Sequence, residues 1–83
     1  MEYEVTVKNI ENDEKNKIVG FNVTTNENQR LAIDKSIPLK LSKTTQQYIS
    51  EALNEAKPEI NEWLASLEFQ NAKIDPETGE IIA

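Results

Sequence analysis

"TTQQYISEALNEAKPEINEWLASLE", residues 44–68, is the stretch that decides the fold. Its apolar residues recur at alternating spacings of four and three positions, at Ile49, Leu53, Ala56, Ile60, Trp63 and Leu67. This spacing places them on one face of an α-helix, and Ala52 and Leu64 widen that face. Thr44 and Gln47 fit a capping box, in which each side chain bonds to the other residue's backbone N–H. The stretch therefore predicts one long amphipathic helix over about residues 44–68.

Pro58 lies in the middle of this predicted helix. A proline removes one backbone hydrogen bond and clashes with the carbonyl of Asn54, at a cost of about 3 kcal/mol inside a helix. Either one helix kinks at this point, or a second helix begins with Pro58 at its first position. The apolar face keeps its phase across the proline, and Lys57 would be a poor N-cap for a second helix. We therefore favour a single helix that is kinked at Pro58.

The residues before the helix predict an antiparallel sheet. Apolar and polar residues alternate from Tyr3 to Val7 and again from Val19 to Thr25, which is typical of strands with one solvated face. We predict strands over about residues 2–10, 17–25 and 30–33, with connecting structure over residues 34–42. Gly20 lies inside the second strand, where a glycine indicates a β-bulge or a close approach of other atoms to the backbone.

"IDPETGEII", residues 74–82, predicts a tight turn within a C-terminal hairpin over about residues 72–82. Asp75 can accept hydrogen bonds from the backbone N–H groups ahead of it, Pro76 presets its own φ, and Gly79 supplies a positive φ. The carboxylates of this stretch are possible ligands for a calcium ion. However, the EF-hand spacing of ligands and central glycine is absent here, and it is absent from "NDEKN" at residues 12–16. We therefore interpret the stretch as a turn.

Together these elements predict a single α+β domain over residues 1–83. A small antiparallel sheet, formed by an N-terminal hairpin or a three-stranded meander together with the C-terminal hairpin, should pack on the one long helix. The residues expected in the core are Tyr3, Val5, Val7, Val19, Phe21, Leu31, Ile49, Leu53, Ile60, Trp63 and Leu67. The spacing of the helix is also that of a coiled-coil seam, so homodimerisation through the same apolar face is an open alternative.

The composition excludes several classes of chemistry. The chain has neither cysteine nor histidine, which removes disulfides, thiolate metal sites and the usual general base at neutral pH. Catalysis could use carboxylates such as Glu51 and Glu55, but a working acid–base pair needs one buried carboxyl with a raised pKa. These glutamates lie opposite the apolar face. We therefore expect a protein that is not an enzyme, with no cofactor and no metal.

The charge is distributed unevenly along the sequence. Residues 1–43 carry seven acidic and seven basic side chains, whereas residues 44–83 carry eight acidic side chains and only Lys57 and Lys73 as bases. The net charge of −6 therefore comes entirely from the second half. Direct binding to nucleic acid or to an anionic membrane needs clustered basic residues, so neither is expected. No signal peptide or run of about 20 apolar residues is visible, and we expect a cytoplasmic protein.

A row of carboxylates on the predicted helix is the candidate partner-binding face. Its members are Glu51, Glu55, Glu59 and Glu62. Positions four apart on a helix lie about 6 Å from one another, which is close to the phosphate spacing along a nucleic-acid strand. The row could therefore mimic nucleic acid and inhibit a DNA-binding protein. The alternative is a solvated helix face that keeps the protein soluble.

The layout of the chain also suggests a source. The segment "NKIVGFNV" (residues 16–23), the single central helix and the terminal "IDPETGEII" resemble small proteins encoded in phages and prophages of low-GC Gram-positive bacteria. This resemblance implies a non-catalytic role in virion assembly or host interaction, and it transfers no functional residues. We thus expect an interaction or structural protein that binds a protein partner or itself. A phage-encoded protein of this kind would lie in the host cytoplasm or in the virion. The nucleic-acid mimic is the alternative, and a carboxylate-based enzyme ranks last.

Overall fold

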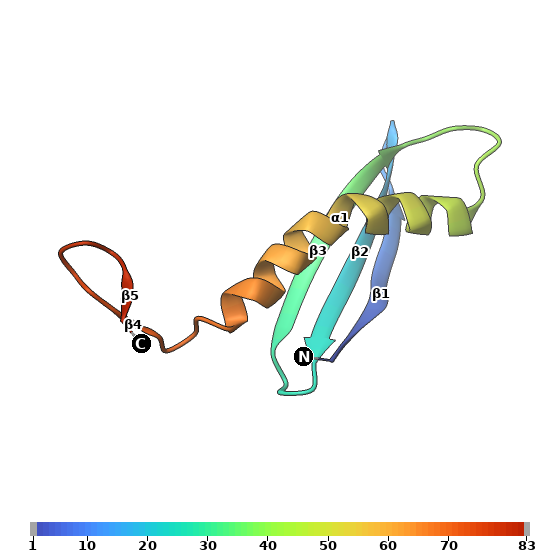
Figure 1. Cartoon of the computed structure of the whole chain (residues 1–83). Helices are drawn as coiled ribbons and strands as arrows, with labels where there is room; N and C mark the ends of the chain where they lie inside the picture. The colour runs from blue at the N-terminus through green and yellow to red at the C-terminus, as the bar shows by residue number, and fades with distance from the viewer. Residues whose placement is uncertain (1, 83) are drawn as a thin grey trace.

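The computed structural model describes residues 2–82 and has an α+β fold, as predicted (Figure 1). A three-stranded antiparallel sheet in the order β1-β2-β3 carries one long helix on one face, and a separate two-stranded hairpin follows the helix. The elements are β1 (Tyr3–Asn12), β2 (Asn16–Thr25), β3 (Arg30–Pro38), α1 (Thr45–Leu67), β4 (Lys73–Ile74) and β5 (Ile81–Ile82). Because the hairpin projects beyond the helix, the molecule is elongated, with extents of 54 × 27 × 16 Å.

Helix α1 is a single helix with Pro58 inside it. The predicted capping box is confirmed: the Thr44 hydroxyl accepts a hydrogen bond from the Gln47 N–H (3.2 Å), and the Gln47 side chain accepts one from the Thr44 N–H (2.7 Å). Pro58 and Asn54 are both exposed. The carbonyl of Asn54 that loses its partner therefore faces solvent, where water can hydrogen-bond to it, and the helix tolerates the proline.

The core lies between α1 and the strands β2 and β3. Its buried apolar residues are Val19, Phe21, Val23, Ile33, Ile37, Tyr48, Ala52, Ala56 and Ile60. The helical members recur every four residues, and the two fully buried alanines allow α1 to lie close against the sheet. Six of the predicted core residues are only partly buried, namely Val5, Leu31, Ile49, Leu53, Trp63 and Leu67. All of them except Leu67 pack against this cluster.

Two core predictions are wrong. Tyr3 and Val7 of β1 are 48% and 44% exposed. They do lie on the face of the sheet that carries the helix, because they pair with Thr25 and Phe21 of β2. However, the contacts of α1 with the sheet are with β2 and β3. A helix is about 10 Å in diameter and neighbouring strands lie about 4.8 Å apart, so one helix covers about two strands.

Strand β3 continues to Pro38, so the prediction that it ends near residue 33, with connecting structure from residue 34, is wrong. Ile33 and Ile37 are both buried under α1, and this contact stabilises the longer strand. Pro38 pairs with Asn16 at the last position of an edge strand. The Leu39 N–H donates a hydrogen bond to the Lys15 carbonyl (2.9 Å), so the N–H groups of odd-numbered residues along β3 point toward β2. The missing donor of Pro38 therefore faces away from the sheet.

The expectation of a bulge or close approach at Gly20 is confirmed. The register between β1 and β2 shifts between Val7 and Asn9, which makes Lys8 an extra residue opposite Gly20. The bulge thus lies on β1, and it returns Ile10 to the same face as Val7. A Cβ atom on Gly20 would lie 2.2 Å from Asn9 Oδ1, so other side chains occupy the space above this glycine.

The predicted C-terminal turn is also confirmed. The Asp75 carbonyl accepts a hydrogen bond from the Gly79 N–H (2.8 Å), and the Asp75 carboxylate accepts one from the Glu77 N–H (2.9 Å). Gly79 has φ of 75°, the left-handed conformation that glycine adopts without strain. Strands β4 and β5 pair beside this turn. Figure 1 shows this hairpin extending away from the sheet, and β4 and β5 form a separate sheet, so the expectation that the hairpin packs on the helix together with the N-terminal strands is wrong.

Candidate functional site

The predicted acidic row lies on the flank of α1 that faces the edge of β3. Glu51, Glu55, Glu59 and Glu62 are all exposed. Glu59 and Glu62 border a shallow hollow with Leu31 and Ile33 of β3, and Glu51 and Glu55 border another with Ile37 and Pro38. The structure therefore brings the four carboxylates onto one side of the molecule, as the helical spacing predicts.

Two members of the row are ion-paired with lysines of the same chain. Lys35 of β3 pairs with Glu59, and Lys43 in the loop before α1 pairs with Glu51 at 2.6 Å. The lysine side chains are only 22% and 16% exposed. Both cations therefore lie close against the row and offset part of its charge, which the sequence of the helix alone does not reveal.

The start of α1 forms a structural cluster around Tyr48. Its hydroxyl accepts a hydrogen bond from the Lys40 N–H (2.9 Å) and donates one to the Lys40 carbonyl (3.1 Å), which fixes the loop before the helix. The amines of Lys17 and Lys43 lie 5.2 and 5.1 Å from the centre of its ring, within cation–π range. A neighbouring hollow of about 520 Å³ is lined by Lys40, Lys43 and residues of the capping box. The capping box satisfies two of the backbone N–H groups at this end of the helix.

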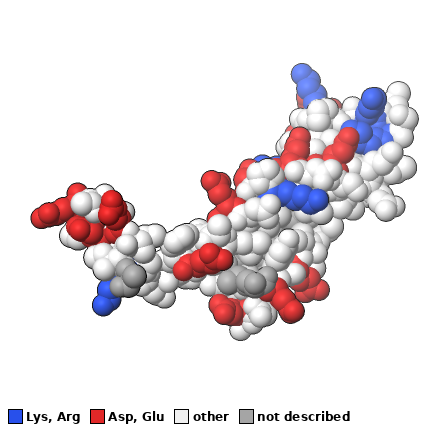
Figure 2. Space-filling model, in the orientation of Figure 1, with Lys and Arg blue, Asp and Glu red and all other residues white. Residues whose placement is uncertain are grey.

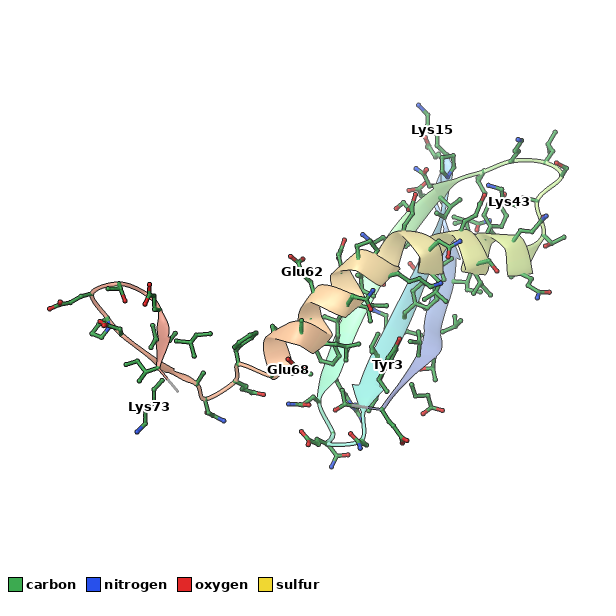
Figure 3. The ribbon with its side chains drawn as sticks, viewed as in Figure 1. Tyr3, Lys15, Lys43, Glu62, Glu68 and Lys73 are labelled. Atoms are coloured by element: carbon green, nitrogen blue, oxygen red, sulfur yellow. The ribbon has the colours of Figure 1, made fainter. Side chains whose placement is uncertain are left out.

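A different surface, which the sequence did not predict, lies along β1. Tyr3, Val5, Val7 and Ile10 share the face of the sheet that carries α1, and we refer to them as the β1 apolar row. Tyr3, Val7 and Ile10 are 48%, 44% and 38% exposed, and Val5 is partly buried. Figure 3 shows Tyr3 near the end of the sheet opposite to Lys15 and Lys43. Within residues 2–82, no strand pairs with the outer side of β1.

The backbone along this edge is free to pair. The Glu2 carbonyl accepts a hydrogen bond from the Asn26 N–H (3.2 Å), so the backbone groups of Glu2 face β2. Successive residues of an antiparallel strand direct these groups to opposite sides. Up to the bulge at Lys8, the N–H and C=O groups of Tyr3, Val5 and Val7 therefore point away from the sheet.

The opposite edge of the sheet is better protected. Strand β3 has its inner face covered by α1, carries Pro38 at its end and lies beside the acidic row. Proline and nearby charge are features that discourage pairing at an edge. Strand β1 has such a feature only at its bulge, at Lys8, so the edge from Tyr3 to Val7 stays open. Its exposed apolar side chains make it a candidate protein-binding site.

The segment after α1, which includes the C-terminal hairpin, carries a second group of exposed apolar side chains. They are Phe69, Ile74, Ile81 and Ile82, each between 51% and 58% exposed. At the junction, the Gln29 side chain donates a hydrogen bond to the Gln70 side chain (2.9 Å). The hairpin thus presents apolar surface on an arm that projects from the body of the molecule.

The charges are segregated along the molecule. Figure 2 shows lysines gathered at the end where α1 begins, whereas carboxylates dominate toward the hairpin.

No three His, Cys, Asp or Glu side chains of residues 2–82 are grouped so that they could hold a metal ion. Within the same residues, the single helix lacks the apolar stretch that crossing a bilayer requires.

Neither a protein-family model, nor a curated protein, nor a solved structure matches this chain.

Proposed function

We propose that this protein is a non-catalytic binding module that docks another polypeptide along strand β1. The observation that carries the proposal is the coincidence of free backbone groups and exposed apolar side chains on one edge strand. An extended segment of a partner would hydrogen-bond to the outward N–H and C=O groups of Tyr3, Val5 and Val7. Its side chains on the helix side would cover the β1 apolar row, as in other cases of strand addition.

The acidic row supports a nucleic-acid mimic less well. Such a mimic presents a series of unpaired negative charges, whereas Glu51 and Glu59 already pair with lysines of this chain. The phage origin implied by the layout of the sequence stays a prediction. A structural or host-interaction protein of a phage would be one setting for a module that binds through its edge strand.

Photo-cross-linking in cells that contain the protein at its natural level tests the proposal. Tyr3 is replaced by p-benzoylphenylalanine, which preserves an exposed aromatic ring on the β1 apolar row. We expect adducts with a polypeptide, and we expect a second substitution, Val7→Pro, to abolish them. The Val7 N–H points away from the sheet, so proline removes a donor at the edge without removing a hydrogen bond to β2.

Ala32→Pro is the matched control. Ala32 is an exposed residue of β3 whose register position also directs its N–H outward, so this substitution blocks the other edge of the sheet. Adducts should survive it. Absence of adducts at Tyr3, or adducts that persist with Val7→Pro, would refute docking along β1. Placing the same photo-reactive residue at Glu55 tests the acidic row, and an adduct there with a DNA-binding protein would favour the nucleic-acid mimic.

A further inference from the structure

We propose that the partner of β1 is a second copy of this chain, paired with it antiparallel across a twofold axis at Thr6. This inference rests on the proposed function and adds the identity and the register of the partner. A twofold contact requires a surface that is complementary to itself. The residues of β1 satisfy this requirement in one register.

The first constraint is the direction of the backbone groups. Only Tyr3, Val5 and Val7 offer outward N–H and C=O groups ahead of the bulge. When Val5 lies opposite Val7 of the second copy, these two residues exchange both hydrogen bonds, and the twofold axis repeats the exchange. Thr6 then lies opposite itself, in a position without hydrogen bonds to the opposite strand, where side chains are closest.

The second constraint is charge. In this register Glu4 lies opposite Lys8 of the second copy, and the twofold axis produces this pair twice. In the single chain the Lys8 amine pairs with Asp34 (3.2 Å), so in the dimer it would exchange that partner for Glu4 or lie between the two carboxylates. Oppositely charged residues in direct cross-strand positions stabilise a sheet, and so does a threonine pair. The next permitted registers place Glu4 opposite Thr6 or opposite Ile10, and both lose this complementarity. Registers shifted further place Glu4 opposite Glu4 or Lys8 opposite Lys8, which is unfavourable.

The third constraint is apolar cover. Val5 and Val7 of each copy lie on the helix side of the sheet, so pairing brings four valines together beside the two helices. Val7 is 44% exposed in the single chain, and this contact would remove much of that surface from water. The bulge at Lys8 ends the regular ladder, so the paired segment is short and its register is fixed by Glu4, Thr6 and Lys8.

Disulfide cross-linking of the purified protein tests the register, and the absence of cysteine from the chain makes single-cysteine variants unambiguous. Thr6→Cys should form a covalent dimer under mild oxidation, because directly opposite residues without hydrogen bonds have Cα atoms about 4.5 Å apart, within the range of a disulfide. Glu4→Cys alone should form no covalent dimer, and neither should Lys8→Cys alone. A mixture of these two variants should form the cross-linked dimer. Cross-linking of Glu4→Cys with itself in preference to Thr6→Cys would overturn the register.

Sedimentation measures the association itself. The wild-type chain should dimerise reversibly. Val7→Pro should raise the dissociation constant about tenfold or more, because each of the two copies loses one N–H donor. Ala32→Pro should leave the dissociation constant unchanged. A wild-type chain that is monomeric up to about 1 mM would overturn the self-pairing. A dimer that persists with Val7→Pro but is lost when Ile81 and Ile82 become Ser would also overturn it, since the C-terminal hairpin would then form the contact.

These outcomes separate the two proposals. Photo-adducts at Tyr3 that contain a different protein, in a chain that stays monomeric when purified, would refute the second copy and retain docking along β1. Absence of any adduct would refute both.

Discussion

Lys8 and Asp34, which lie on the two opposite edge strands of the sheet, form an ion pair that crosses the middle strand above Gly20 (3.2 Å). Gly20 pairs with Asn9 of β1 on one side and with Asp34 of β3 on the other. Because glycine has no side chain, the Lys8 stem can pass over β2. The close approach at Gly20 thus has a specific use, which is to connect the two edges on the face opposite the helix.

Replacing Gly20 should therefore uncouple Lys8 from Asp34. The Cβ atom of Gly20→Ala would lie 2.5 Å from Asp34 Oδ1 and 2.8 Å from Lys8 Cε, so both side chains must move outward. A double-mutant cycle on Lys8 and Asp34, measured by urea unfolding at a concentration where the chain is monomeric, should give roughly 0.2–1 kcal/mol with Gly20 and close to zero with alanine. The Lys43–Glu51 pair lies elsewhere and is the control, since its coupling should not change. Equal coupling of Lys8 and Asp34 in both backgrounds would contradict this.

Enlarging Ala56 should destabilise the fold. Ala56 is completely buried between α1 and the sheet, and a leucine there would push the helix away from β2 and β3. We expect Ala56→Leu to lower the free energy of unfolding by about 1–3 kcal/mol, as overpacked cores do. Ala65→Leu is the matched control, because Ala65 is an exposed residue of the same helix and should change stability by less than about 0.5 kcal/mol. Similar losses of unfolding free energy in both variants would contradict the idea that Ala56 is needed for α1 to lie close against the sheet.

Removing Pro58 should stabilise the protein. Pro58→Ala supplies the N–H that the Asn54 carbonyl lacks, and it relieves the clash with that carbonyl. The free energy of unfolding should rise by about 1–3 kcal/mol, after allowance for the greater freedom of the unfolded chain. Thermal unfolding followed by circular dichroism measures this. Pro76→Ala, in the turn of the C-terminal hairpin, should bring no such gain, and a decrease with Pro58→Ala would mean that the proline has a tertiary role.

Asp13 should contribute to the pH dependence of stability. The backbone N–H of Lys15, and then that of Asn16, donate hydrogen bonds to its carboxylate (2.9 and 2.7 Å) and lower the pKa of Asp13 below its ordinary value of 3.8. A lowered pKa in the folded state gives a contribution that is present above 3.8 and is lost as the pH falls through the folded-state value. Carbon-13 NMR titration of the Asp13 carboxyl should therefore show a midpoint below 3.8. The difference in unfolding free energy between wild type and Asp13→Asn should shrink as the pH falls in this range.

The elements could be predicted from the sequence because each depends on local chemistry. The four-and-three spacing predicted α1, the capping box predicted its start, and Asp75 and Gly79 predicted the C-terminal turn. Gly20 predicted a close approach because a glycine inside a strand has few other uses. These signals involve residues that are near one another along the chain, or a single residue type with one dominant role.

The candidate site could not be predicted, because it depends on how the elements cover one another. The sequence of β1 reads as a strand with one buried face, and only the position of α1 over β2 and β3 leaves Tyr3 and Val7 exposed. The width of a helix against three strands could have indicated that one strand stays uncovered, but not which one. The partial neutralisation of the acidic row was missed for the same reason, since Lys35 reaches Glu59 from another element.

The C-terminal hairpin has a consequence for any measurement that averages over the whole chain. A two-stranded hairpin is at best marginally stable by itself in water. Within residues 2–82, the hydrogen bond between the Gln29 and Gln70 side chains ties this arm to the body of the molecule. Heating should therefore melt the arm well before the sheet and α1 come apart. Trp63, which packs at the margin of the core, would report only the later event, whereas a protease acting near Asn71 would sense the first.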